Sequence, residues 1–184
     1  MTRLKISLIV IIMIILAAVM RLVALGAVEF WYDEAFTVLI SRLSWERMIQ
    51  ATAGDTHPPL FYMLMWGWLR LVGSSEFSVR LVSVLASLAA LPLAWRIMSR
   101  LELSDPARLT VLALLAFGPF EVYFAQEARM YAMLQLFYMV GALAVLERRY
   151  WLLCIANIGL LYLHNYGLFY VPTLVVLALY LDHR

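Results

Sequence analysis

Long apolar runs alternate with short polar segments along the whole chain. The first run, residues 6–25, has about the 20 residues that an α-helix needs to cross about 30 Å of hydrocarbon. The pattern predicts an all-α fold, a polytopic membrane helical bundle with about six spans and a single domain over residues 1–184. The five later spans are predicted at residues 80–98, 109–125, 130–146, 151–163 and 167–181.

Residues 60–72 are an exception, because this apolar run is only about 13 residues long and carries two tryptophans and an arginine. Such a segment is typical of a helix at the membrane surface or of a re-entrant helix. If it stays at the outer surface, both termini are cytoplasmic and the first outer loop covers about residues 26–78. The positive clusters then all lie on the cytoplasmic side, as the positive-inside rule expects: Arg3/Lys5, Arg96/Arg100/Arg108, Arg148/Arg149 and His183/Arg184.

This long outer loop is predicted to carry membrane-surface helices. Apolar residues recur at helical spacing after Asp33 and Glu34, which places the two acids at a helix start. Ser44 is predicted to cap a second short helix over residues 45–52. Two prolines directly after His57 restrict the backbone behind that side chain.

Composition narrows the class of protein. The chain is 65% hydrophobic, with a mean hydropathy of +0.89, far above soluble domains. We therefore expect an integral protein of a bacterial-type inner or plasma membrane, with membrane lipids as neighbours and an uncleaved first span, since signal peptides have shorter apolar cores. The net charge of +2 comes from small clusters between apolar runs, so no nucleic-acid partner is expected.

Two polar groups of the outer loop are candidates for chemistry. Asp33 and Glu34 could cap a surface helix, or they could supply a general base or the ligands of a divalent metal ion. His57 could be a solvated loop residue, or its imidazole could orient an acid or a phosphate. Position in the sequence does not separate these readings.

The later loops hold further candidates. Glu127 and Arg129 lie at the outer end of a predicted span, where a charge at membrane depth costs about 2.5–3.5 kcal/mol. Arg129 could form an ion pair with Glu127 or Glu121, or its guanidinium could grip a phosphate. His164 precedes the last span and could belong to a polar turn or to the same outer site.

Four motifs follow one another along the chain: Tyr32-Asp33-Glu34-Ala35, His57-Pro58-Pro59-Leu60-Phe61-Tyr62, Gly73 to Leu81 and Gln126-Glu127-Ala128-Arg129-Met130-Tyr131-Ala132. With these motifs in this order, the chain resembles the N-terminal part of family 39-type membrane glycosyltransferases of the GT-C fold. That family is related to protein O-mannosyltransferases and to the aminoarabinose transferases of lipid A.

The resemblance implies an inverting transfer, on the extracytoplasmic face, from a polyprenyl-phosphate-linked sugar to a hydroxyl of a protein, lipid or glycan acceptor. It implies that Asp33 is the catalytic carboxylate with Glu34 as its neighbour, and that Arg129 binds the donor phosphate. His57, Glu127 and His164 are expected to contribute to substrate binding. The resemblance requires no cofactor, although Asp33 and Glu34 could hold a divalent metal ion.

Relatives in this family continue for several more spans, whereas this sequence stops after six. We therefore expect the chain to be a fragment or half of a split enzyme. Residues from other spans would then complete its pocket. Two alternatives are a non-catalytic partner that keeps the fold and a transporter or flippase-like module. Charges at mid-membrane on broken helices would favour a transporter, while acids gathered at one surface favour the transferase.

Overall fold

The fold is known from a computed structural model that describes residues 2–183. Within these residues the backbone forms ten helices and no strand, which confirms the predicted all-α class. The helices are α1 (Arg3–Leu22), α2 (Tyr32–Arg42), α3 (Trp45–Ala53), α4 (Leu60–Val72), α5 (Glu76–Arg100), α6 (Asp105–Phe117), α7 (Pro119–Ala125), α8 (Tyr131–Leu146), α9 (Tyr150–Leu163) and α10 (Gly167–Asp182).

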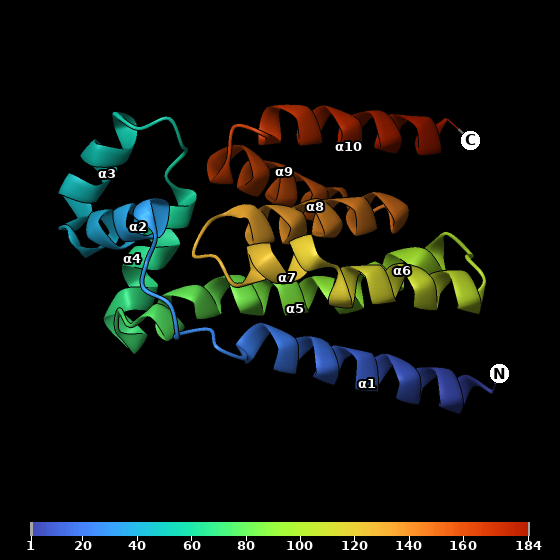
Figure 1. Ribbon diagram of the computed structural model, residues 1–184. Coiled ribbons are helices and arrows are strands. Elements are labelled where there is room, and N and C mark those ends of the chain that lie inside the picture. Colours follow the sequence, from blue (N-terminus) through green and yellow to red (C-terminus); the bar gives the residue numbers. More distant parts are fainter. Residues whose placement is uncertain (1, 184) are drawn as a thin grey trace.

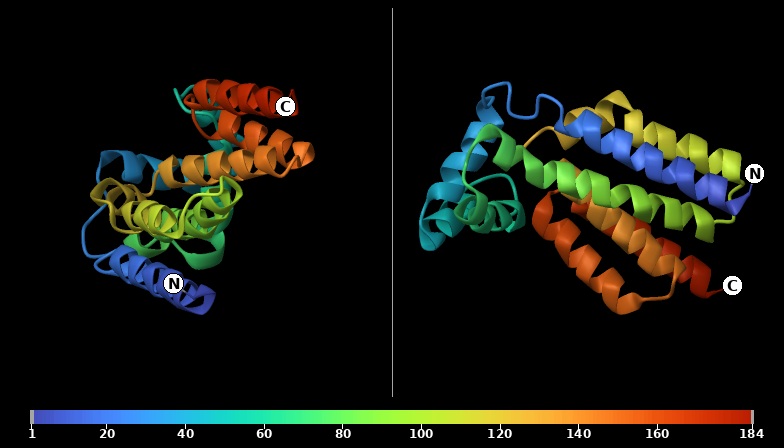
Figure 2. Two further views of the ribbon diagram at one scale, coloured as in Figure 1. Left: turned by 90° about the vertical axis from the view of Figure 1, so that its right-hand side faces the viewer. Right: turned by 90° about the horizontal axis from the view of Figure 1, so that it is seen from below.

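The helices form a bundle with a separate group at one end. Figure 1 shows α1, α5, α6 and α8 to α10 running along a common direction, while α2, α3 and α4 gather beyond one end of these rods. Figure 2 shows the same division from two further sides. The first turn of α1 and the last turn of α10 both lie at the opposite end. The chain therefore traverses the bundle an even number of times.

Helix length supports only part of the predicted span count. Among the described residues, α1 and α5 are long and apolar enough to cross a membrane, and α6 with α7 makes a third span if the bent pair is counted as one. Helices α8, α9 and α10 have 16, 14 and 16 residues. A helix of 16 residues is about 24 Å long, shorter than the hydrocarbon layer. Six spans therefore remains a prediction.

The predicted continuous span over residues 109–125 is wrong in one respect. The helix breaks at Gly118, and α6 and α7 meet at a bend of 48°. Pro119 causes the break, because its nitrogen carries no hydrogen to bond the carbonyl four residues earlier. The bend turns α7 so that it delivers residues 126–130 to the start of α2.

A buried arginine satisfies the carbonyls that this break exposes. Arg21 on α1 is fully buried. It donates to the carbonyl oxygens of Ala116 at 2.6 Å and Leu115 at 3.0 Å, and its Nε donates to Ser87 Oγ at 3.0 Å. The Leu115 carbonyl is the one that Pro119 cannot bond. Arg21 thus stabilises the bend and fastens α1 to both α5 and α6.

The outer loop is helical as the sequence predicted. Asp33 and Glu34 lie in the first turn of α2, and the Ser44 hydroxyl accepts a hydrogen bond from the Arg47 amide at the start of α3. Helix α4 lies with α2 and α3 at one end of the bundle and is not one of its long rods (Figure 1). The position of α4 at the membrane surface remains a prediction.

Candidate functional site

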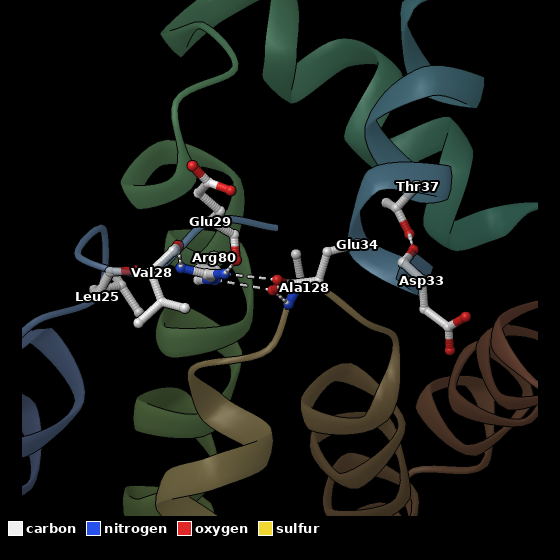
Figure 3. A network of polar contacts seen from close by, with 8 residues as sticks. All are labelled: Leu25, Val28, Glu29, Asp33, Glu34, Thr37, Arg80 and Ala128. Carbon is white, nitrogen blue, oxygen red and sulfur yellow. Dashed lines mark hydrogen bonds and ion pairs between the residues drawn. The ribbon is translucent and has the colours of Figure 1, made fainter. Parts of the chain in front are cut away.

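The site is built where the first turn of α2 meets the loop between α7 and α8. The Glu34 carboxylate is buried and accepts a hydrogen bond from the Ala128 amide at 2.8 Å. From α5, Arg80 Nε donates to Glu34 Oε1 at 2.9 Å, and Arg80 Nη2 donates to Oε2 at 2.6 Å. Figure 3 shows this two-pronged pair beside the Ala128 backbone. Glu34 therefore has partners for both carboxylate oxygens.

Arg80 also holds the connection between α1 and α2. Its two Nη atoms donate to the carbonyl oxygens of Leu25 at 2.9 Å, Val28 at 2.8 Å and Glu29 at 3.2 Å. The guanidinium thus joins α5, the start of α2 and the residues that follow α1. Charge-assisted, bidentate contacts of this kind are the strong ones in proteins. We infer that Glu34 and Arg80 set the position of the α2 start.

Asp33 has a different environment from its neighbour. Its side chain is 35% exposed, and its Oδ2 lies 3.7 Å from Nη2 of Arg129, whose side chain is only 5% exposed. Figure 3 shows the Asp33 carboxylate turned away from the Glu34–Arg80 pair. Arg129 Nε is buried without a hydrogen-bond partner. Arg129 therefore combines a loose contact to an accessible acid with an unused donor.

The two acids do not form a common cation site. Both Glu34 oxygens face Arg80, while Asp33 points elsewhere. Over residues 2–183, no three His, Cys, Asp or Glu side chains come together as a metal-binding group.

Two histidines from distant loops lie next to each other near Arg129. The rings of His57 and His164 lie 5.2 Å apart, edge to face. The Tyr166 amide donates to His164 Nδ1 at 3.0 Å, which requires an unprotonated Nδ1. Burial, followed by the charges of His57 and Arg129, lowers the pKa of His164 below its ordinary value of 6.5. His164 is therefore a neutral ring at physiological pH, with Nε2–H as its donor.

His57 contacts the Asp55 carboxylate, which in turn is hydrogen-bonded to Tyr62. The Asp55 Oδ2 atom lies 3.5 Å from His57 Nδ1 and accepts a hydrogen bond from the Tyr62 hydroxyl at 3.1 Å. Tyr62 on α4 is fully buried. Burial and the Asp55 charge raise the pKa of Tyr62 well above its ordinary value, so it remains a donor. Asn165 Nδ2 bonds the Thr56 carbonyl at 2.7 Å and ties this loop to the start of α10.

Glu127 lies two residues before Arg129 and is also buried, at 6% exposure. Its side chain has no hydrogen bond to any part of residues 2–183, and Oε2 is fully enclosed. Burial, then the charges of Glu34 and Asp33, raise its pKa above 4.5, although Arg129 opposes the shift. Glu127 lines a cavity of about 200 Å³ with Glu34 and Arg80, which Asp33 and Arg129 do not line.

An aromatic groove adjoins the histidine pair. It has a volume of about 540 Å³. Two of its lining residues, Tyr131 and Tyr166, pack on the His164 ring with centroids 5.9 and 4.4 Å from it. The groove continues between α8 and α10, lined also by Phe124, Leu134, Gln135, Tyr138 and Tyr170. A long apolar or partly polar ligand could follow this path from the polar site along the bundle.

The structure thus brings together four of the six predicted site residues through the contacts Asp33–Arg129 and His57–His164 and the proximity of Arg129 to His164. Glu34 and Glu127 line the separate cavity. Sequence reasoning missed Arg80 and Tyr62, although both occur in the quoted motifs. An arginine at the start of an apolar span, as Arg80 is, was the available signal, since such a charge needs a partner.

Comparison with known proteins identifies the family. Residues 56–184, more than two thirds of the chain, match the family described as dolichyl-phosphate-mannose-protein mannosyltransferase. His57, Glu127, Arg129 and His164 lie within the matched region, while Asp33 and Glu34 precede it. No curated protein and no solved structure matches the chain significantly. The chain accordingly belongs to the dolichyl-phosphate-mannose-protein mannosyltransferase family of membrane glycosyltransferases.

Proposed function

We propose that this protein transfers a sugar from a polyprenyl-phosphate donor to an acceptor hydroxyl at the end of the bundle formed by α2, α3 and α4. The observation that carries the proposal is the meeting of the accessible Asp33 carboxylate with the buried Arg129 guanidinium, 3.7 Å apart. One group can take a proton and the other can hold a phosphate. At 3.7 Å no atom fits between the two groups, so the proposed reaction requires the accessible Asp33 side chain to turn away from Arg129 when the reactants bind.

In the proposed reaction Asp33 accepts the proton of the acceptor hydroxyl, and the acceptor oxygen attacks the anomeric carbon of the donor sugar. The bond from that carbon to the phosphate oxygen breaks, and its electron pair leaves with the polyprenyl phosphate. Arg129 stabilises the negative charge on the departing phosphate, and its free Nε offers a second donor. A single displacement of this kind inverts the anomeric centre.

The remaining residues act around this pair. His164 presents a neutral N–H donor, and His57 is held by Asp55, so both can orient the phosphate or the sugar. Glu34, predicted beside Asp33 as a catalytic residue, is proposed instead as a positioning residue, because Arg80 and the Ala128 amide occupy its oxygens. The aromatic groove beside His164 is the proposed path of the polyprenyl chain.

The extracytoplasmic face is proposed for this end of the bundle. At the opposite end of the bundle, where α5 and α10 end and α6 begins (Figure 1), the ion pairs involve Arg96, Arg100, Arg108 and Arg149. By the positive-inside rule that end is cytoplasmic. Both termini are then cytoplasmic, and the lipid-linked donor meets the site from the outer leaflet.

A transfer assay tests the proposal. The protein as encoded, including any residues that its gene specifies beyond residue 184, is reconstituted with a radiolabelled polyprenyl-phosphate sugar and a mixture of hydroxyl acceptors. Asp33→Asn keeps size and hydrogen bonding but removes the base, so turnover should fall by about 10²–10⁴-fold with an unchanged melting temperature. The matched control is Glu46→Gln, an exposed acid on α3, which should leave turnover unchanged.

Glu34→Gln separates the two adjacent acids. If Glu34 is a positioning residue, the Glu34→Gln variant should lose both stability and turnover. Loss of a catalytic base would lower turnover alone. Undiminished transfer in Asp33→Asn would refute its assignment. Donor binding without transfer by the wild-type protein would favour the non-catalytic partner.

A further inference from the structure

The cavity beside Glu127 is a separate feature from the Asp33–Arg129 pair. It has a volume of about 200 Å³, the share of about seven water molecules in the liquid. Asp33 and Arg129 are not among its lining residues. Its polar and aromatic walls come from both sides of the α1–α2 connection and from the end of α7: Trp31, Glu34, Arg80, Tyr123, Gln126 and Glu127.

Most polar groups of this cavity are already engaged. Glu34 and Arg80 bond one another. The Gln126 side-chain nitrogen donates to three carbonyl oxygens at the end of α1, those of Met20, Arg21 and Val23, at 3.1 to 3.3 Å. The Gln126 bonds fix that side chain against the end of α1, and Glu34 and Arg80 neutralise each other's charge.

Glu127 also lines the cavity, and its Oε2 atom is buried without a hydrogen-bond partner. A polar group that is 94% buried and unpaired costs about 1–3 kcal/mol. Burial also raises its pKa, which favours the neutral carboxyl. A neutral carboxyl both donates and accepts, so its natural partner is a hydroxyl group.

The mouth of the cavity is aromatic. Trp31 is 47% exposed and Tyr123 is 59% exposed, although both are large apolar side chains. Aromatic faces next to hydrogen-bonding groups suit a ring that has an apolar face and a polar edge. A sugar ring has both, and a volume of about 200 Å³ is comparable with one such ring.

We propose that this cavity binds a hydroxyl-rich ring of the acceptor, with Glu127 as its hydrogen-bond partner and Trp31 as its stacking surface. The inference rests on the proposed function and makes the acceptor a saccharide, held across Glu34 from the donor phosphate. Asp33 would act on one part of this acceptor while the cavity holds another. Glu127 is thus a specificity residue and takes no proton in the reaction.

Direct binding of a neutral sugar tests this subsite without relying on transfer. The protein is placed in phosphatidylcholine nanodiscs, free of maltoside detergent, and binding of methyl β-D-glucopyranoside is measured by saturation-transfer NMR. Glu127→Ala and Trp31→Ala should each weaken binding by about tenfold. Glu127→Gln keeps hydrogen bonding and should change binding by less than about threefold. The matched controls, Glu46→Ala and Trp151→Ala, alter exposed residues outside the cavity and should bind as the wild type does.

The same measurement separates this inference from the proposed function. Asp33→Asn and Arg129→Ala should abolish or weaken transfer but leave glucoside binding intact, so failure of transfer would not remove the subsite. Equal binding by wild type, Glu127→Ala and Trp31→Ala would overturn the inference. Preferential binding of glucosamine, lost in Glu127→Gln, would show a site for cations and would also overturn it.

Discussion

The two ends of the bundle both place carboxylates among arginines, but they treat them differently. At the end that holds the termini, Glu147 is contacted by Arg96 at 2.7 Å, Arg100 at 2.9 Å and Arg149 at 3.3 Å. These three arginines are about half exposed. At the other end Arg129 is buried, lies 3.7 Å from Asp33 and keeps an unpaired Nε.

The Glu147 carboxylate is neutralised by the surrounding arginines, whereas the Arg129 guanidinium has only a long contact to Asp33. Around Glu147, several flexible cations share one acid and water serves their remaining donors, so little energy depends on any single contact. Around Arg129, burial has removed water without supplying full hydrogen bonding, and a group of this kind destabilises the fold unless a ligand completes it. A buried guanidinium close to an accessible carboxylate therefore distinguishes the candidate site from the half-exposed arginines around Glu147 more clearly than the number of charges does.

The first prediction is an all-or-none test of which end faces outward. In a Cys154→Ser background, Thr56→Cys and Ser75→Cys should react with an impermeant maleimide in intact cells, while Ser99→Cys should react only after permeabilisation. All three positions are exposed. Protection at position 75 with labelling at position 99 would mean that α4 crosses the membrane.

The second prediction concerns the Glu34–Arg80 pair, which we expect to stabilise the fold. Arg80→Ala leaves a buried carboxylate without its partner and should lower the free energy of unfolding by about 3–5 kcal/mol. Unfolding in a denaturing detergent, followed by circular dichroism, measures this loss. Arg47→Ala, an exposed arginine on α3, is the control and should have little effect. If Arg80→Ala lowers the free energy of unfolding only slightly, the Glu34–Arg80 pair contributes little to stability, as we expect of single contacts around Glu147.

The third prediction sharpens the contrast at Arg129. Arg129→Ala should weaken binding of the polyprenyl-phosphate donor by about 10–100-fold, the value of a charge-assisted hydrogen bond. Arg129→Lys should restore only part of the affinity, because an ammonium group lacks the planar fork. Donor titration monitored by tryptophan fluorescence checks both variants. Unchanged affinity, together with loss of the protein from the membrane, would assign Arg129 a purely structural role.

The fourth prediction uses pH and has the smallest expected effect. The pKa of Glu127 is raised in the folded protein by burial and by Glu34. Its contribution to stability is therefore fully present below the ordinary pKa of 4.5 and is lost as pH rises through the folded pKa. Glu127→Gln removes this loss. The melting temperature of the variant minus that of the wild type should therefore be larger at pH 8 than at pH 5. The opposite trend would show that the ionised carboxylate stabilises the fold.

Much of the architecture was predictable from local pattern. Apolar runs and caps located the helices of residues 26–78 and those of the bundle except the separate α7, since these signals depend on neighbouring residues. Ser44 and Asp33 with Glu34 lie at helix starts as their sequence context predicts. The break at Gly118 was missed, although Pro119 is visible in the sequence, because a hydropathy pattern does not record a missing amide hydrogen.

The sequence by itself determined the membrane class, the helical order and the loops that hold the candidate site residues, because hydropathy and motifs are local. Only the tertiary structure decided that Glu34 bonds Arg80 while Asp33 faces Arg129, and that Glu127 lines a separate cavity. Adjacent acids look alike in sequence, yet successive side chains of a helix start point to different neighbours. Which partner each acid meets depends on segments some 46 to 96 residues away, and only packing of the whole bundle brings these together.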